Sequence, residues 1–340
     1  MRIAVLASGA FAEPTLRWLG LSPHEVPLVV TQPARPSGRG RRIAATPTRE
    51  LADELGFEVL ESQDVNSPDF IATMRSTQTQ LGLVIAFGQK LGPQLLASLP
   101  AGFINLHASL LPRLRGAAPI NWAIVRGEER TGCTVFRIVE RMDAGPILSS
   151  RWTAVKPEET AGELHDRLAA IGEDAVDAAL QQFEGGTIPE GEPQNEQGAT
   201  RAPKLTKRDG LIRFDRSASS VARHICGMTP WPGATARFQS ADGRWERVTI
   251  VRARRTEDSS RPTDAPGTID DRRYVAVEDG FLEILEIQPS SGRLMGWADY
   301  VNGRRVAPGD KFVVAGHEQQ TTKGKKDNAG RAQEGASRNR

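Results

Sequence analysis

Cysteine is scarce in this sequence, which holds only two in 340 residues. Cys133 lies in an apolar run and Cys226 in a segment with helical spacing, so the pair forms neither a disulfide framework nor a metal-binding spacing. Histidine is also sparse, and four of its five positions are scattered along the chain: His24, His165, His224 and His317. We therefore expect no metal site and a protein that works in a reducing cytoplasm.

Long hydrophobic runs and a dinucleotide fingerprint are missing as well. No run reaches about 18 apolar residues, and the short apolar start is followed quickly by charge, so neither a membrane span nor a signal peptide is expected. The turn Ser8-Gly9-Ala10-Phe11 lacks the G-x-G-x-x-G spacing that lets a backbone approach a pyrophosphate, which argues against a nicotinamide cofactor. The net charge of +2 means that a polyanion would have to meet local basic patches.

What is present in the first half is a regular alternation of strands and helices. Short apolar runs at 3–8, 26–31, 83–88 and 103–107 alternate with segments of helical spacing. The region 160–183 predicts a long amphipathic helix, in which Thr160 and Glu163 can form a capping box. The pattern predicts an α/β domain over residues 1–185, built on an open, mostly parallel, Rossmann-like sheet.

The composition changes after residue 185. Residues 186–205 are rich in Gly, Pro, Glu and Gln and are predicted to be a linker. Residues 206–316 hold short apolar segments between turn residues, which predicts a smaller C-terminal β-barrel domain of the OB-like kind. Residues 317–340 are polar with an excess of basic side chains, so we expect a disordered basic tail. We expect the whole chain to be a monomer.

The candidate chemistry gathers between residues 103 and 145. Asn105 and His107 are two positions apart on a predicted strand and therefore share a face, and Asp143 lies in a turn between two later strands. A histidine can accept a proton, an aspartate can orient the imidazole, and an asparagine amide can donate to an oxyanion. The three suit acyl transfer to an amine by direct attack. The alternative is that His107 is a buried histidine satisfied by a backbone carbonyl.

Two loops complete the candidate site. The strand that carries His107 runs into Ser109-Leu110-Leu111-Pro112, where proline should stop regular pairing and give a stiff loop at a strand end. Residues 32–42 break every regular pattern and carry four arginines without an acid, so they could lie along a phosphate backbone. The alternative for this second loop is an ordinary solvated surface segment.

The residues in these stretches resemble the folate-dependent formyltransferases. The resemblance rests on the segment 103–112, on Arg115-Gly116-Ala117-Ala118-Pro119-Ile120, on the arginine loop, on residues 202–210 and on Pro230-Trp231-Pro232-Gly233-Ala234. It covers residues 1 to 315. Within this family the match is nearest to the members that formylate the methionine of initiator tRNA. The departures, at Ser8-Gly9-Ala10-Phe11, Leu114 and Gly145-Pro146, fall on the rim of the site.

This resemblance implies transfer of a formyl group from 10-formyltetrahydrofolate to the α-amino group of initiator methionyl-tRNA. It implies that His107 is the base, Asn105 the oxyanion donor and Asp143 the orienting acid, with Ser109, Leu110, Leu111 and Pro112 binding folate and no metal involved. The residues expected to contact tRNA are basic: Arg35, Arg39, Arg41, Arg42, Lys204 and Lys207. The alternatives are another folate-dependent formyltransferase, such as one acting on a nucleotide-sugar amine or a formyltetrahydrofolate dehydrogenase, and a nonenzymatic RNA-binding protein on the same scaffold.

Overall fold

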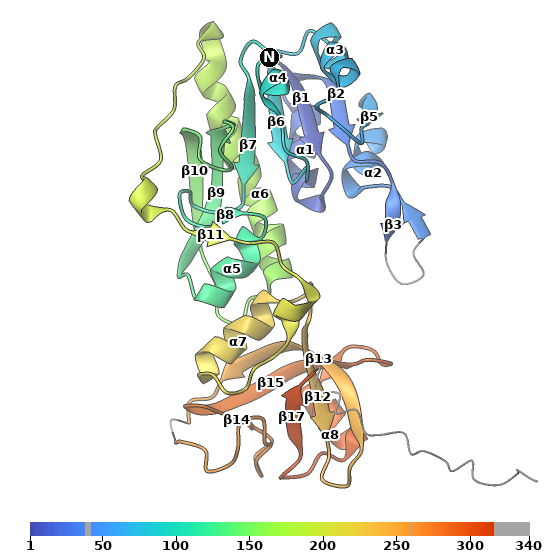
Figure 1. The fold of residues 1–340 in the computed structure, drawn as a ribbon, viewed down its shortest axis with the longest axis vertical. Helices are drawn as coiled ribbons and strands as arrows, with labels where there is room; N and C mark the ends of the chain where they lie inside the picture. Colours follow the sequence, from blue (N-terminus) through green and yellow to red (C-terminus); the bar gives the residue numbers. More distant parts are fainter. Residues whose placement is uncertain (38–41, 259, 316–340) are drawn as a thin grey trace, which may run out of the picture.

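The computed structural model describes residues 1–37, 42–258 and 260–315 as two domains, one above the other in Figure 1. The elements of the N-terminal domain follow one another as β1 (Arg2–Ala7), α1 (Glu13–Leu21), β2 (Glu25–Thr31), β3 (Arg35–Ser37), β4 (Arg42–Ala44), α2 (Pro47–Glu54), β5 (Val59–Glu61), α3 (Pro68–Ser76), β6 (Leu81–Ile85), α4 (Pro93–Leu96), β7 (Phe103–His107), β8 (Arg115–Gly116), α5 (Pro119–Arg126), β9 (Arg130–Arg137), β10 (Ile147–Ala154) and α6 (Ala161–Leu180). Seven of these strands form one sheet in the order β10-β9-β7-β6-β1-β2-β5. Strands β5, β2, β1, β6 and β7 are parallel to one another, and β9 is antiparallel to both of its neighbours, β7 and β10.

The sheet is buried on both faces because β6 and most of β1 are apolar at successive positions. In β1, Ile3 and Val5 pack into the cluster that includes α1 and α6, whereas Ala4 and Leu6 pack into the cluster that includes α3 and α4. Successive side chains point to opposite faces of a strand, so one continuous apolar run serves both cores. The predicted open, mostly parallel α/β sheet is confirmed.

The C-terminal domain is an antiparallel sheet that curls into a barrel-like form (Figure 1). Its elements, with the strand that precedes them, are β11 (Arg201–Ala202), α7 (Ala218–Gly227), β12 (Ala234–Gln239), β13 (Trp245–Arg255), β14 (Val275–Val277), β15 (Gly280–Pro289), β16 (Met295–Gly296), α8 (Trp297–Arg304) and β17 (Lys311–Val314). The sheet order is β14-β15-β13-β12-β17, and β16 pairs with β15. This confirms the predicted β-barrel class. The predicted tail 317–340 lies outside the described residues, and the predicted domain boundaries stay predictions.

Three local predictions can be compared directly with the structure. Helix α6 begins with both halves of the capping box between Thr160 and Glu163, as predicted. Helical spacing over residues 91–99 also predicts a helix, and the observed helix α4 is shorter, covering only four residues. The segment 32–42 is not wholly irregular, because β3 lies inside it and pairs antiparallel with β4, which begins at its last residue.

The two domains meet through α5, α7 and the start of α6. Gly227 of α7 lies so close to α5 that a Cβ there would come within 2.6 Å of Val125 Cγ2, and the Asn121 amide donates to the Gly227 carbonyl at 2.8 Å. Arg252 of β13 adds a charged contact across the boundary: it donates to both carboxylate oxygens of Glu163 and to the Glu158 carbonyl. The domain junction is therefore packed and hydrogen-bonded rather than loosely tethered.

Candidate active site

The candidate site lies where three parallel strands end together. The chain passes from β1 to β2 and β5 on one side of the sheet and then to β6 and β7 on the other side of β1. Such a switch point leaves a crevice outside the carboxyl ends of the strands, which is where ligands bind in open α/β sheets. Ala86, directly after β6, has a φ of 46° and Gly88 has a φ of 82°. This edge therefore carries tight turns that bring backbone to the crevice.

His107 is the last residue of β7 and is 6% exposed. Its Nε2 atom lies 2.9 Å from the carbonyl oxygen of Leu114, and its ring meets the ring of Phe136 edge-on with centroids 6.5 Å apart. A carbonyl only accepts, so Nε2 carries the hydrogen of this bond and Nδ1 of a neutral ring is left as the acceptor. The carbonyl contact weighed as the alternative for His107 is thus present at one nitrogen, while Nδ1 makes no hydrogen bond within the described residues.

Asn105 and Asp143 reach the same region from different elements. Asn105 is half-buried in β7, and its side-chain amide makes no hydrogen bond to the described part of the chain, so both its groups are open to a ligand. Asp143 has a φ of 52° in the connection between β9 and β10, and its Oδ2 accepts from the Gly116 amide at 2.7 Å. Within residues 1–37, 42–258 and 260–315 no hydrogen bond joins Asp143 to His107. The two are linked instead through the segment 114–116.

The loop 109–112 is held from within and from β9. The Ser109 hydroxyl, fully buried, donates to the Arg113 carbonyl at 2.7 Å, and the Thr134 hydroxyl donates to the Ser109 carbonyl at 2.7 Å while accepting from the Leu111 amide. Regular pairing already ends at His107, before this loop begins, so Pro112 is not what ends the strand. Ser109 thus shapes the loop, and the half-buried Leu110 and Pro112 have surface left for a ligand.

The segment predicted as a linker contributes contacts that the sequence did not reveal. Thr200 accepts from the Arg115 amide through its carbonyl and from the Leu114 amide through its hydroxyl, both at 2.8 Å, and β11 pairs with β8. Arg115 is 8% exposed and donates to Gln194 and to both carboxylate oxygens of Glu196. These bonds lower the pKa of Glu196, with Arg115 the largest cause. A polar, Gly- and Pro-containing segment gave no local signal for such contacts.

The basic residues expected to contact tRNA are spread over two places. Arg35 is exposed on β3, in the hairpin that projects from the N-terminal domain on the side of the C-terminal domain (Figure 1). Lys204 and Lys207 are exposed where the chain enters the C-terminal domain. Arg39 and Arg41 lie outside the described residues, and of Arg42 only the backbone, paired with β3, is described.

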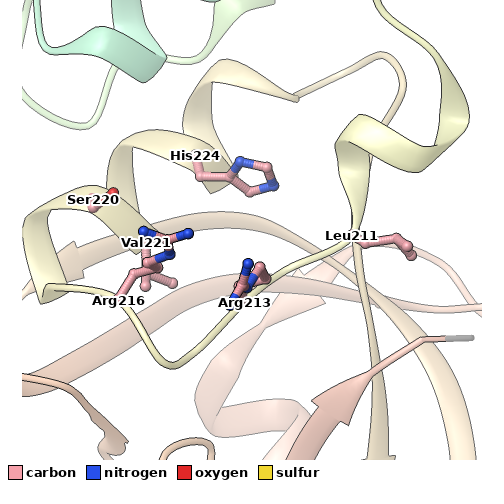
Figure 2. A pocket seen from close by; sticks show the side chains of 6 residues that line it. All are labelled: Leu211, Arg213, Arg216, Ser220, Val221 and His224. Atoms are coloured by element: carbon pink, nitrogen blue, oxygen red, sulfur yellow. The ribbon is translucent and has the colours of Figure 1, made fainter. Parts of the chain in front are cut away.

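A small basic cavity of about 160 Å³ lies on the C-terminal domain against α7. Figure 2 shows the side chains around it: Leu211, Arg213, Arg216, Ser220, Val221 and His224. Nε2 of His224 is buried without a partner among the described residues, and burial lowers the pKa of this histidine. Arg213 is paired with Asp215, whereas Arg216 has no ion pair within the described part of the chain.

Among the described residues no group of three or more His, Cys, Asp or Glu side chains is placed to hold a metal ion. In that same part of the chain no helix combines the length and apolar character needed to cross a bilayer.

Comparison with known proteins bears on both domains. The family described as "Formyl transferase" matches residues 1–180, and the one described as "Formyl transferase, C-terminal domain" matches residues 204–305. A methionyl-tRNA formyltransferase of Solibacter usitatus is 38% identical over 314 residues, covering 92% of this chain and 98% of that protein. One from Methylobacterium sp. is 37% identical over 316 residues, covering 92% and 99%.

A solved structure shares the fold at lower identity. HypX from Aquifex aeolicus, in complex with tetrahydrofolic acid, aligns with a TM-score of 0.56 and 18% identity, covering 88% of this chain and 47% of that one. At this identity the likeness concerns the arrangement of the backbone alone. The two domain matches and the two full-length relatives carry the assignment: this chain belongs to the formyl transferase family and, within it, to the methionyl-tRNA formyltransferases.

Proposed function

We propose that the chain transfers the formyl group of 10-formyltetrahydrofolate to the α-amino group of initiator methionyl-tRNA. The acceptor is supported by the relatives, which are named methionyl-tRNA formyltransferases along nearly their whole length. The donor is supported by a structural neighbour that binds tetrahydrofolic acid and by the stiff loop 109–112 beside the strand ends. The product is formylmethionyl-tRNA for the initiation of translation.

The observation that carries the mechanism is the pair of unengaged polar atoms at the end of β7. The amine nitrogen of methionyl-tRNA attacks the formyl carbon, and the carbonyl oxygen becomes an oxyanion. The Asn105 amide donates to that oxyanion, and His107 Nδ1 takes the proton that the attacking amine loses. When the bond from carbon to N10 breaks, N10 receives a proton and tetrahydrofolate leaves. His107 is positioned for this exchange by its bond to the Leu114 carbonyl.

Asp143 supports the site through the loop rather than by touching the imidazole. Its carboxylate holds the Gly116 amide, and the segment 114–116 in turn supplies the carbonyl that orients His107. We therefore propose that Asp143 orients His107 indirectly, through its hydrogen bond to the Gly116 amide.

Recognition of tRNA is assigned to the basic residues outside the crevice. The sequence-derived set is Arg35, Arg39, Arg41, Arg42, Lys204 and Lys207, and Arg216 beside the cavity of Figure 2 extends it onto the C-terminal domain. Guanidinium and ammonium groups bind phosphates without reading sequence, so this set supplies affinity and orientation.

The test is a formylation assay with 10-formyltetrahydrofolate and charged initiator tRNA. The chain should give formylmethionyl-tRNA, and His107→Ala should lower kcat by about 10² to 10⁴, the usual contribution of a general base, while tRNA binding is kept. His24→Ala is a matched control, because His24 precedes the start of β2, whereas His107 is the last residue of β7, so the two lie at opposite ends of the parallel strands. Near-normal turnover by His107→Ala would rule out His107 as the general base. Tight tRNA binding by the unaltered chain without any turnover would favour the hypothesis of a nonenzymatic RNA-binding protein.

A further inference from the structure

Gln194 joins three separate segments around the candidate active site. Its Oε1 accepts from Arg115 Nε at 3.1 Å and from Arg115 Nη2 at 2.7 Å. Its Nε2 donates to the carbonyl of Asp143 at 2.9 Å and to the carbonyl of Gly145 at 2.7 Å. One half-buried amide therefore ties β8 and the connection between β9 and β10 to the segment that follows α6.

Only one orientation of this amide satisfies its neighbours. A flipped amide would place Oε1 against two carbonyl oxygens and the NH2 group against a guanidinium, so four favourable contacts would become four repulsive ones. Both hydrogens of Nε2 and both lone pairs of Oε1 are used as the structure has them. A side chain bonded at every site has little freedom to move, and neither do the loops it joins.

The loop that Gln194 holds combines a strained residue with a tightly packed one. Asp143 has a φ of 52°, a left-handed conformation that a non-glycine residue adopts at a cost, and it persists only where surrounding contacts fix it. Gly145 is packed against β9 so closely that a Cβ would come within 1.7 Å of the Arg137 carbonyl oxygen. The two carbonyls bonded by Gln194 lie at these two residues, so the amide fixes the loop on both sides of Ala144.

We propose that Gln194 is a positioning residue for formyl transfer. It keeps the Asp143 carboxylate on the Gly116 amide and, through Arg115, keeps β8 beside it. The carbonyl of Leu114, which bonds His107, precedes this strand directly. Gln194 thus acts on His107 through two loops without touching the reacting atoms. The role rests on the proposed function and extends it to a segment whose composition predicted only a linker.

Two substitutions separate the halves of the side chain. Gln194→Ala removes all four bonds. Gln194→Glu keeps an acceptor for Arg115 but places a second oxygen against the carbonyls of Asp143 and Gly145. It therefore loses the hydrogen bonds to the loop and keeps those from Arg115. The matched control is Gln197→Ala, which changes the same residue type in the same segment, where the side chain is exposed and makes no hydrogen bond within the described residues.

We expect kcat to fall about 10- to 100-fold in Gln194→Ala and in Gln194→Glu, because misplacement of a catalytic group by about 1 Å can cost 10²-fold. KM for the tRNA should stay within about twofold, since the basic residues are untouched. Gln197→Ala should match the unaltered chain. A Gln194→Glu variant with unchanged kcat would overturn the proposal, and so would a loss that appears in KM or in thermal stability alone.

A second measurement stays informative even without turnover. Amide hydrogen exchange should quicken at Gly116 and around residues 143–147 in both Gln194 variants and should not change in Gln197→Ala. If the unaltered chain forms no formylmethionyl-tRNA but exchange quickens as expected, the proposed function fails while the loop contact stands. Unchanged exchange together with unchanged kcat would refute the positioning role and leave the proposed function intact.

Discussion

The contact between Glu163 and Arg252 gives the sharpest prediction about stability, because it joins the two domains and caps a helix at once. Oε2 of Glu163 accepts from the Thr160 amide at 2.8 Å and from its hydroxyl at 2.9 Å, which completes the capping box of α6. Arg252 Nη2 donates to Oε1 at 2.7 Å. The Arg252 guanidinium is the largest cause that lowers the pKa of Glu163 from 4.5 to about 2, and the same pair raises the pKa of Arg252.

The expected magnitude follows from that pKa and from exposure. If fully transmitted to folding, the fall of the Glu163 pKa from 4.5 to about 2 would correspond to roughly 3 kcal/mol. The Glu163 side chain is 52% exposed, so solvent screens the pair and exposed ion pairs contribute about 0.2–1 kcal/mol. Glutamine can keep the capping box through its own oxygen, so Glu163→Gln removes the ion pair alone, and we expect it to lower the free energy of unfolding by about 0.5–1 kcal/mol.

The pH dependence has a definite sign. A carboxyl group whose pKa is lower in the folded chain stabilises folding at pH values above its unfolded pKa, and the contribution disappears as the pH falls from about 4.5 to about 2. The gap in unfolding free energy between the unaltered chain and Glu163→Gln should thus be constant from pH 5 to 7 and should narrow below about pH 4.5. A gap that widens in acid would contradict the assignment.

Thermal unfolding followed by circular dichroism measures this directly. For a domain of this size, about 0.5–1 kcal/mol corresponds to a fall in Tm of about 1–4 °C at pH 7. Asp174→Asn is the matched control on the same helix, because Asp174 is exposed and has no ion pair among the described residues. A double-mutant cycle with Arg252→Gln should give a coupling of at least about 0.5 kcal/mol. Additive losses would refute an interaction between the two side chains.

Two further predictions concern the strand pair at the site and the entry to the C-terminal domain. Gly116→Ala should lower the free energy of unfolding by about 2–3 kcal/mol, because φ is 122° and a Cβ would come within 2.5 Å of the Ala202 carbonyl oxygen. Gly243→Ala, with φ of 89° and open space around it, isolates the conformational part, and equal losses in urea unfolding would argue against the clash. Lys207→Ala should weaken tRNA binding and reduce the slope of log K against log salt by about 1, whereas an unchanged slope would remove this lysine from the interface.

Local patterns predicted the elements that depend on neighbours in the sequence. The capping box at Thr160 and Glu163, the buried parallel strands and the antiparallel β9 and β10 all follow from periodicity and side-chain chemistry within a few residues. Helix α8 was not predicted, because Gly and Arg interrupt its short apolar face of Trp297 and Tyr300. Its burial depends on β-strands far away in the chain, which periodicity cannot report.

The sequence predicted which residues belong to the candidate site but not the hydrogen bonds that connect them. Asn105 and His107 share a face because they are two apart on a strand, and the structure places them at the expected edge of the sheet. Asp143 accepts from the Gly116 amide, and Gln194 donates to the Asp143 carbonyl from 51 residues away. Both hydrogen bonds depend on the tertiary fold, which the local sequence does not reveal. Polar residues in a Gly- and Pro-containing segment look alike whether water or an arginine satisfies them.

The pairing of β8 with β11 has a consequence for synthesis of the chain. A nascent polypeptide that has reached residue 180 contains the whole parallel sheet, yet the amides of Leu114, Arg115 and Ala117 still lack the Thr200 and Ala202 partners that the finished protein gives them. At roughly 5–20 residues per second, those partners follow about 1–4 s later. All strands of the parallel sheet are therefore synthesised before the crevice can be completed. An amino-terminal fragment cut at residue 180 would lack the hydrogen bonds to Thr200 and Ala202.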